Sequence, residues 1–338
     1  MADALSALLS ERDWLLADGA TGTTLFNMGL QSGDAPELWN VDHPDRIEAL
    51  YRGAVDAGSD IFLTNTFGGT AARLKLHDAQ DRVHELNRAG AEIGRKVADS
   101  AGRPVIVAGS MGPTGEIMAP MGPLTHERAV KMFRDQAEGL KAGGVDVLWV
   151  ETISAPEELK AAAEAARLTD MPWCVTMSFD TAGRTMMGTT SEAMSRLIGK
   201  LDHKPLAYGA NCGVGSSDLL RTVMGFDDAV APLIAKGNAG IPKYVEGHIH
   251  YNGTPELMAR YACMARDAGA TIIGGCCGTT PEHLAAMRAA LETTPRADAP
   301  TLDEVAEVLG GFSSDTDGTG DTSAAPARER RGRRRGRT

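Results

Sequence analysis

The sequence is poor in cysteine and in aromatic residues, and it lacks long apolar runs. Five cysteines in 338 residues are too few and too unevenly spaced for a disulfide framework, so we expect reduced thiols. No apolar stretch is long enough to cross a bilayer. The short apolar segment at residues 4–9 is followed by Glu11, Arg12 and Asp13, so it indicates neither a signal peptide nor an anchor. These absences predict a cytoplasmic protein without a membrane partner.

Charge is unevenly distributed, with an acidic body and a basic end. The net charge is −11, but residues 328–338 hold seven arginines and one glutamate, which leaves −17 for residues 1–327. An acidic body argues against nucleic acid as the main partner, because duplex binding relies on clustered cations. Residues 313–327 lack the apolar side chains that offset the entropy of ordering. We therefore predict one domain over residues 1–310 and a disordered basic tail over residues 311–338.

What the chain does contain is a regular alternation of strand-like and helix-like segments. Apolar runs predict eight buried strands, at residues 14–20, 60–66, 105–111, 147–153, 173–179, 206–212, 232–239 and 271–277. Helical patterns follow them at residues 44–57, 82–98, 125–142, 156–168, 191–198, 217–224, 255–268 and 281–291. Eight βα units within about 300 residues fit a single (β/α)8 TIM barrel better than a doubly wound sheet, which usually has fewer strands.

Polar and reactive residues gather where the predicted strands end, which is where a barrel of this kind builds its active site. In chain order they are Asp18, Gly19, Ala20, Asn65, Glu151, Thr152, Asn211, Cys212, Asn238, Cys276 and Cys277. A hydrophobic core would not need polar groups at these positions. The sequence thus predicts a site at the carboxyl end of the barrel.

Cys276 and Cys277 are adjacent, and adjacent residues of a regular strand point to opposite faces. The flanking glycines at 274, 275 and 278 let the backbone leave the pleat, so that both thiols can converge. Cys212 ends another strand and opens onto the same end of a closed barrel. Three thiolates with one open position are the arrangement expected of a catalytic zinc. The alternative is that these three residues are small buried hydrophobes, as we expect for Cys174 and Cys263.

A zinc ion with three thiolates carries a net charge of −1, which makes it a poor generator of hydroxide but suits it to holding another thiolate. The sequence therefore favours a thiol substrate. Two other patterns have ordinary explanations. His248 and His250 lie in a predicted polar loop over residues 245–253, where histidines are expected to be solvated. The glycine-rich segments at residues 18–23 and 109–116 match neither a dinucleotide fingerprint nor a P-loop.

Seven motifs resemble, in order and spacing, the zinc-dependent homocysteine S-methyltransferases. They are Asp18-Gly-Ala-Thr-Gly-Thr, Thr64-Asn-Thr-Phe, Gly112-Pro-Thr-Gly, Glu151-Thr, Asn211-Cys, Asn238-Ala-Gly and Gly274-Gly-Cys-Cys-Gly-Thr-Thr-Pro. This family includes betaine-homocysteine and S-methylmethionine-homocysteine methyltransferases and the homocysteine module of cobalamin-dependent methionine synthase. The resemblance implies a (β/α)8 barrel that holds zinc on Cys212, Cys276 and Cys277, with the homocysteine thiolate as fourth ligand.

The resemblance also implies where the amino acid end of homocysteine binds. The expected contacts are Asp18, Gly19, Ala20, Asn65, Glu151, Thr152 and Asn211. Glu151, together with Asp18, is expected to accept hydrogen bonds from the ammonium group. Backbone N–H groups around Gly19 and Ala20 are expected to bind the carboxylate.

The motifs look closest to those of the methionine synthase homocysteine module, although the sequence carries no cobalamin signature. We therefore expect a stand-alone module that receives its methyl group from methylcobalamin on a partner protein. The alternative is a small donor such as betaine or S-methylmethionine. Quaternary ammonium sites usually need aromatic faces, and only Phe26, Trp39, Phe67 and Trp149 could supply a partial box. A second alternative is a zinc- or homocysteine-binding protein without catalysis.

Overall fold

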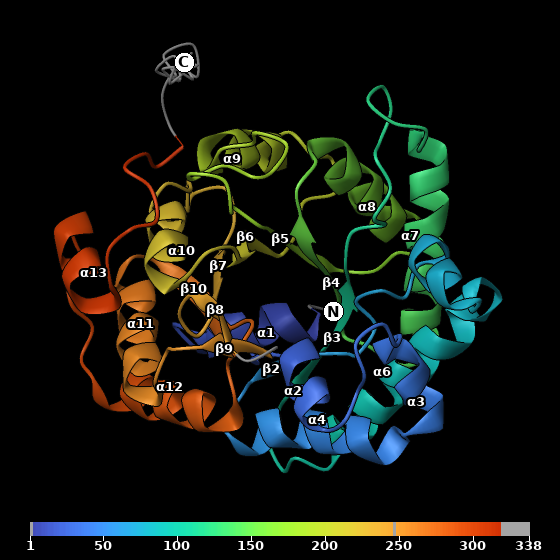
Figure 1. Ribbon diagram of the computed structural model, residues 1–338, viewed down its shortest axis with the longest axis horizontal. Coiled ribbons are helices and arrows are strands. Elements are labelled where there is room, and N and C mark those ends of the chain that lie inside the picture. Colours follow the sequence, from blue (N-terminus) through green and yellow to red (C-terminus); the bar gives the residue numbers. More distant parts are fainter. Residues whose placement is uncertain (1–2, 246–247, 319–338) are drawn as a thin grey trace, which may run out of the picture.

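The computed structural model describes residues 3–245 and 248–318, and it contains a ring of parallel strands surrounded by helices (Figure 1). The strands of the ring are β1 (Leu15–Leu16), β2 (Ile61–Leu63), β3 (Ile106–Met111), β4 (Val147–Ile153), β5 (Trp173–Met177), β6 (Ala207–Cys212), β7 (Leu233–Gly237) and β10 (Ala270–Gly275). Their order is β1-β10-β7-β6-β5-β4-β3-β2. All eight predicted strands are present, and the prediction of a (β/α)8 barrel is confirmed.

The barrel closes between its first and second strands. Ala17 forms a parallel bridge with Ile61, and the Asp60 N–H donates to the Leu16 carbonyl oxygen over 2.7 Å. Side chains alternate along each strand, so that Leu15 and Ala17 belong to the cluster inside the barrel while Leu16 faces the helices. Two buried core layers therefore hold the strand ends, and the residues on them, in fixed positions.

Helices cover the outside of the ring (Figure 1). Those following the strands are α4 (Pro44–Asp56), α6 (Val83–Asp99), α7 (His126–Ala142), α8 (Pro156–Leu168), α9 (Ser191–Gly199), α10 (Ser216–Val223), α11 (Pro255–Asp267) and α12 (Pro281–Thr293). Each lies within two residues of its predicted bounds, because local signals set the ends. Thr125 caps α7 and Thr254 caps α11, and α8 begins with a proline.

Other elements lie at the two ends of the barrel. α1 (Ala4–Glu11) covers the end where the strands begin, and its Leu5 and Leu8 are buried in the interior cluster. Short helices lie in the loops at the other end or beyond the last strand, namely α2 (Gly22–Asn27), α3 (Trp39–Asp42), α5 (Ala71–Leu74) and α13 (Leu302–Leu309). The loop predicted at residues 245–253 is wrong, because β8 (Pro242–Val245) and β9 (His248–Tyr251) pair as an antiparallel hairpin. The side chains of His248 and His250 lie outside the described residues.

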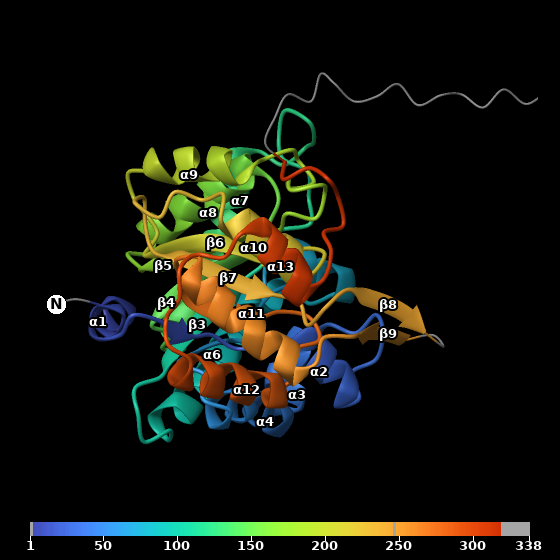
Figure 2. The same cartoon turned by 90° about the vertical axis from the view of Figure 1, so that its left-hand side faces the viewer.

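Figure 2 shows α1 and the β8–β9 hairpin at opposite ends of the molecule. The hairpin projects beyond the strand ends and therefore marks the mouth of the barrel. Past α13, the chain contacts α10, where Ser313 donates to Asp218 and Arg221 donates to the Ser314 carbonyl oxygen, and residues 317 and 318 then lie against Gly183. The predicted tail beyond residue 318 lies outside the described residues.

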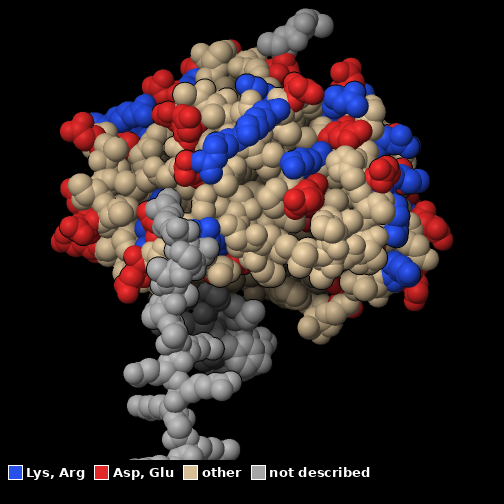
Figure 3. Space-filling model, turned by 90° about the horizontal axis from the view of Figure 1, so that it is seen from above, with Lys and Arg blue, Asp and Glu red and all other residues tan. Residues whose placement is uncertain are grey.

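Acidic and basic side chains are both spread over the face seen in Figure 3, with one short run of basic side chains near its upper centre. Over the described residues, no helix combines the length and the apolar character needed to cross a membrane.

Candidate active site

The three cysteines meet at the mouth of the barrel. Cys212 is the last residue of β6, and Cys276 and Cys277 directly follow β10, with β7 between these two strands. Their Sγ atoms all lie within 4.8 Å of one another. Cys174 is buried inside the barrel, and Cys263 is half-buried on α11. The structure thus brings together the three thiols expected to bind metal and leaves the other two apart.

Backbone geometry aims these thiols at one point. Cys212 has a φ of 61°, in the left-handed region that side-chain-bearing residues rarely adopt, and this turns its side chain out of the strand. The Asn238 side chain accepts from the Cys277 N–H over 3.1 Å and donates to the Gly213 carbonyl oxygen over 2.9 Å. Asn238 therefore joins the backbone of the cysteine pair to the loop that carries Cys212.

The thiols influence one another's protonation. Hydrogen bonds from Cys212 and Cys276 lower the pKa of Cys277 to about 3. Hydrogen bonds to Cys276 and Cys277 raise the pKa of the Cys212 thiol far above its ordinary value. Cys277 is therefore the thiol of the cluster that loses its proton most readily.

The donor set fits zinc. Tetrahedral zinc with bonds of about 2.3 Å places its sulfur ligands about 3.8 Å apart, which lies within the 4.8 Å that separates the three Sγ atoms at most. No histidine or carboxylate joins the three thiols in the described part of the chain. A metal held here would keep one position open toward the barrel mouth.

A cavity of about 350 Å³, which we call the mouth cavity, lies beside the thiols and is lined by all three of them. Glu151 at the end of β4 faces this cavity, and its Oε1 accepts from the Ser110 hydroxyl over 2.6 Å. Burial raises the pKa of Glu151 to about 7, and nearby Lys236 opposes this rise. No cation pairs directly with Glu151 among the described residues, so this carboxyl group is available to an ammonium ligand.

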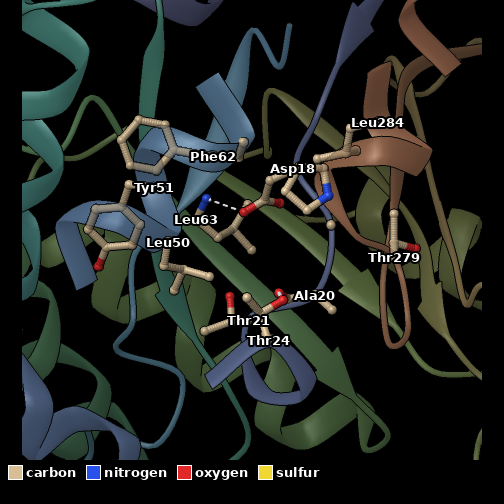
Figure 4. A pocket seen from close by; sticks show the side chains of 13 residues that line it. Asp18, Ala20, Thr21, Thr24, Leu50, Tyr51, Phe62, Leu63, Thr279 and Leu284 are labelled. Atoms are coloured by element: carbon tan, nitrogen blue, oxygen red, sulfur yellow. Dashed lines mark hydrogen bonds between the residues drawn. The ribbon is translucent and has the colours of Figure 1, made fainter. Parts of the chain in front are cut away.

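Asp18 also faces the mouth cavity, but both of its oxygens already have protein donors. Oδ2 accepts from the Leu63 N–H over 2.7 Å, the hydrogen bond drawn in Figure 4, and Oδ1 accepts from the Nζ of Lys236.

Figure 4 also shows a smaller cavity, of about 30 Å³, behind the turn that follows Asp18. Its volume corresponds to roughly one water molecule.

The other expected contacts are distributed around the mouth cavity. Gly19, Ala20, Asn65 and Thr152 line it, whereas Asn211 is buried behind it. The Ala20 N–H donates to the Thr279 carbonyl oxygen over 3.0 Å, so it is not free to bind a carboxylate.

The two asparagines act mainly within the protein. Asn211 exchanges hydrogen bonds with Thr152, accepting from its N–H over 2.9 Å and donating to its hydroxyl over 2.8 Å. The Asn65 side chain donates to the Pro36 carbonyl oxygen over 2.7 Å. Asn211 therefore fixes the end of β4, and Asn65 fixes the segment that carries Glu37.

Of the four aromatic residues considered for a cation box, only Phe67 lines the mouth cavity. Trp39 is buried beneath Arg46, Trp149 lies 5.8 Å from the Nζ of Lys236, and Phe26 is exposed. Charged groups of both signs lie on the same side of the cavity as Phe67, because Arg73 and His77 line it and lie close enough to Glu37 to act on its pKa. Asp34 and the buried Glu37 line it there, and Glu37 accepts from the Gly68 N–H over 2.6 Å.

Sequence reasoning missed two residues of the site. Lys236 lies in β7, is 2% exposed and lines the mouth cavity. The sequence feature that could have revealed it is a single charged residue within a predicted buried strand. Tyr251 packs against Gly278, which has a φ of 78° and leaves no room for a Cβ beside the ring. Tyr251 hydrogen bonds to Cys277 and was missed because its strand was predicted as loop.

Residues 15–291 match the profile of the family described as homocysteine S-methyltransferase. The chain belongs to this family. Its members are methyltransferases, and the structural resemblance extends to solved enzymes of the family. The metallated and oxidized forms of the homocysteine methyltransferase MmuM from Escherichia coli each superpose with a TM-score of 0.69 and 27% identity, over 85% of this chain and 99% of that chain.

Relatives of the family include larger proteins. Methionine synthase of Mycobacterium tuberculosis is 30% identical over 86% of this chain, and that of Mycobacterium leprae is 30% identical over 84%. The chain spans about a quarter of the length of these methionine synthases, 25% in each case.

Proposed function

We propose that this homocysteine S-methyltransferase uses zinc, held by Cys212, Cys276 and Cys277, to transfer a methyl group to the thiol of homocysteine and so form methionine. The convergence of the three Sγ atoms within 4.8 Å carries this proposal. A bound zinc would supply a positive centre that keeps the sulfur of the substrate in its nucleophilic thiolate form.

The chain's own side chains have separate tasks in this proposal. Glu151 accepts from the ammonium group of homocysteine, because its carboxyl group faces the mouth cavity without a protein cation bonded to it. Asn211 holds Thr152 and the end of β4, which fixes the position of Glu151 relative to the thiols. Fixing both ends of the substrate places its sulfur toward the remainder of the cavity, where the methyl donor binds.

A small, positively charged methyl donor of the betaine or S-methylmethionine type is the donor that the cavity supports best. Its volume of about 350 Å³ leaves room beside homocysteine for a second small molecule. Asp34 and Glu37 line the side near Phe67, and Arg73 and His77 on the same side offset part of their negative charge. Carboxyl groups attract an onium cation even where a complete aromatic box is missing.

Methylcobalamin on a partner protein, which the motifs favour, is the second candidate donor. Large apolar side chains are exposed on the segments that follow the strands at the barrel mouth, as expected of a surface that meets another protein. They are Phe26, Leu76, Ile117, Met121, Met186, Met187 and Ile241. The 30% identity to methionine synthases supports the same candidate.

Steady-state assays decide between these donors. Purified, zinc-loaded protein is given homocysteine with betaine, S-methylmethionine or methylcobalamin in turn, and methionine is quantified. We expect turnover with a small onium donor. Turnover with methylcobalamin alone would instead assign the donor to a partner protein. Homocysteine binding without methionine formation from any donor would mean a binding protein without catalysis.

The zinc site has its own test. Cys277→Ala removes one ligand, so we expect bound zinc, measured by elemental analysis after dialysis, to fall from about one per chain to near zero, with loss of methyl transfer. Cys263→Ala is the matched control, because Cys263 lies on α11 away from the cluster. Full zinc occupancy in Cys277→Ala would contradict the proposed three-thiolate site.

A further inference from the structure

Residues 328–338, which we call the arginine segment, are strongly basic in a chain whose other residues carry a net charge of −17. Methyl transfer to homocysteine gives this segment no task. It holds seven arginines and two glycines, without lysine or apolar side chains. Arginine forms paired hydrogen bonds with phosphate, which lysine cannot do, and segments rich in arginine and glycine bind single-stranded nucleic acid. The composition therefore favours a polyanion that carries phosphates.

The structure fixes the point from which the chain runs toward the arginine segment. Residues 317 and 318 lie against Gly183, which has a φ of 75° and leaves no room for a Cβ beside them. Gly183 belongs to the connection between β5 and α9, so the described chain ends next to the loop that leads into α9. The ten residues from Gly318 to Arg328 span at most roughly 35 Å. The first arginine therefore stays within that distance of this loop.

α9 carries a second basic feature, an open groove of about 410 Å³ that it forms with α8, which we call the α9 groove. Three cations line it, namely Lys160, Arg196 and Lys200, and no acidic residue of the described chain does so. Arg196 pairs with Glu192, whereas Lys160 and Lys200 have no ion pair among the described residues. A groove with cationic walls suits the phosphate backbone of a single strand. Because α9 is nine residues long, roughly 14 Å, the arginine segment can reach this groove.

We propose that the arginine segment and the α9 groove together bind a single strand of nucleic acid through its phosphates. This inference goes beyond the proposed function and does not depend on it. A single strand can follow the segment and the groove without approaching the rest of the acidic surface. A planar anionic membrane fits less well, because it would face the acidic body as a whole and repel it. An acidic protein would offer carboxylates in place of phosphates.

The test uses the full chain and a fluorescently labelled 20-nucleotide oligouridine RNA, with binding measured by anisotropy. We expect a dissociation constant of about 1–100 μM at physiological salt, the range of contacts without sequence preference. Neutralising six or more phosphates should make the affinity fall by at least about 100-fold between 50 and 200 mM salt. Truncation after Gly318 keeps every described contact and should abolish binding. Equal RNA affinity of the truncated and full chains would overturn the proposal.

The groove is tested by Lys160→Gln/Lys200→Gln, which removes its two unpaired cations. Binding should weaken about tenfold, and the salt slope should fall by about two, because two phosphate contacts are lost. Lys75→Gln/Lys96→Gln is the matched control, since it removes the same charge from exposed positions outside α8 and α9. The control should bind like the wild type. Equal weakening in both double variants would mean that net charge alone acts and would overturn the role of the groove.

Two further probes identify the wrong polyanion. Vesicles of phosphatidylserine and phosphatidylcholine represent a membrane, and polyglutamate represents an acidic protein. We expect the full chain to bind neither at concentrations where it binds the RNA. Binding of vesicles or of polyglutamate without binding of RNA would overturn the proposal and assign the arginine segment to that class of partner.

Discussion

Glu151 provides a prediction at the scale of a single residue. Its carboxyl group has a pKa raised to about 7 by burial, so it becomes neutral as the pH falls through that value and then no longer attracts an ammonium group. We expect methionine, which has the amino acid end but no thiol to titrate, to bind about tenfold more weakly at pH 6 than at pH 8. Calorimetric titrations of the zinc-loaded protein at both pH values measure this difference.

The control for this prediction is Glu151→Gln, which cannot ionise. Its affinity for methionine should be low and nearly the same at pH 6 and pH 8. A tenfold pH dependence that survives in Glu151→Gln would assign the titration to another group. Glu151 would then not be the ammonium site.

The sequence predicts the roles of some site residues and not those of others. Cys276 and Cys277 were predictable as ligands, because two thiols between glycines at a strand end have few other uses. The pairing of Asp18 with Lys236 was not, because the two residues are 218 positions apart and meet only through the closure of the barrel. The Ala20 N–H was assigned to the substrate because hydrogen bonding between its turn and Thr279 depends on how β1 and β10 pair.

α1 supports a prediction at the scale of an element. Leu5 is fully buried against the interior of the barrel, so Leu5→Ala should lower the free energy of unfolding by about 3 kcal/mol, because it leaves a cavity. Urea denaturation measures the change. Activity at 25 °C should be retained, since α1 lies at the end of the barrel opposite the mouth (Figure 2). Ser10→Ala, at an exposed position of the same helix, should change stability by less than about 0.5 kcal/mol.

Elements with strong local signals were predictable, and those fixed by distant contacts were not. The eight outer helices have capping residues, first-turn prolines or long apolar faces that the sequence displays directly. The β8–β9 hairpin is only four residues per strand, and the segment was read as polar loop. β1 is two residues long, and it was predicted from the apolar run at residues 14–20, which extends beyond the strand at both ends.

The whole molecule can be tested by shortening the chain at two points. Truncation after Gly318 keeps every described contact, so we expect an unchanged melting temperature. Truncation after Gly310 removes the hydrogen bonds that Ser313 and Ser314 make with the buried Asp218 and Arg221, which keep their ion pair with each other, so we expect a loss of about 2 kcal/mol in unfolding free energy. Thermal melts compare the two proteins.

Both truncated proteins should retain turnover with a freely diffusing donor at low temperature, because residues 311–318 contact α10 and do not line the mouth cavity. Equal melting temperatures would show that the segment after α13 adds nothing to the stability of the barrel. The predicted domain boundary at residue 310 would then describe the folding unit well.

The position of the three cysteines on β6 and after β10 has a consequence for the folding of the whole chain. A metal that joins Cys212 to Cys276 and Cys277 closes a ring of roughly sixty residues that contains β7 and α11, much as a covalent cross-link would. Closing a ring of that size removes about 4 kcal/mol of chain entropy from the unfolded state. The ion that holds the substrate sulfur would thus also cross-link the last quarter of the barrel to the rest. Catalysis and the stability of the fold would then depend on the same three metal–sulfur bonds.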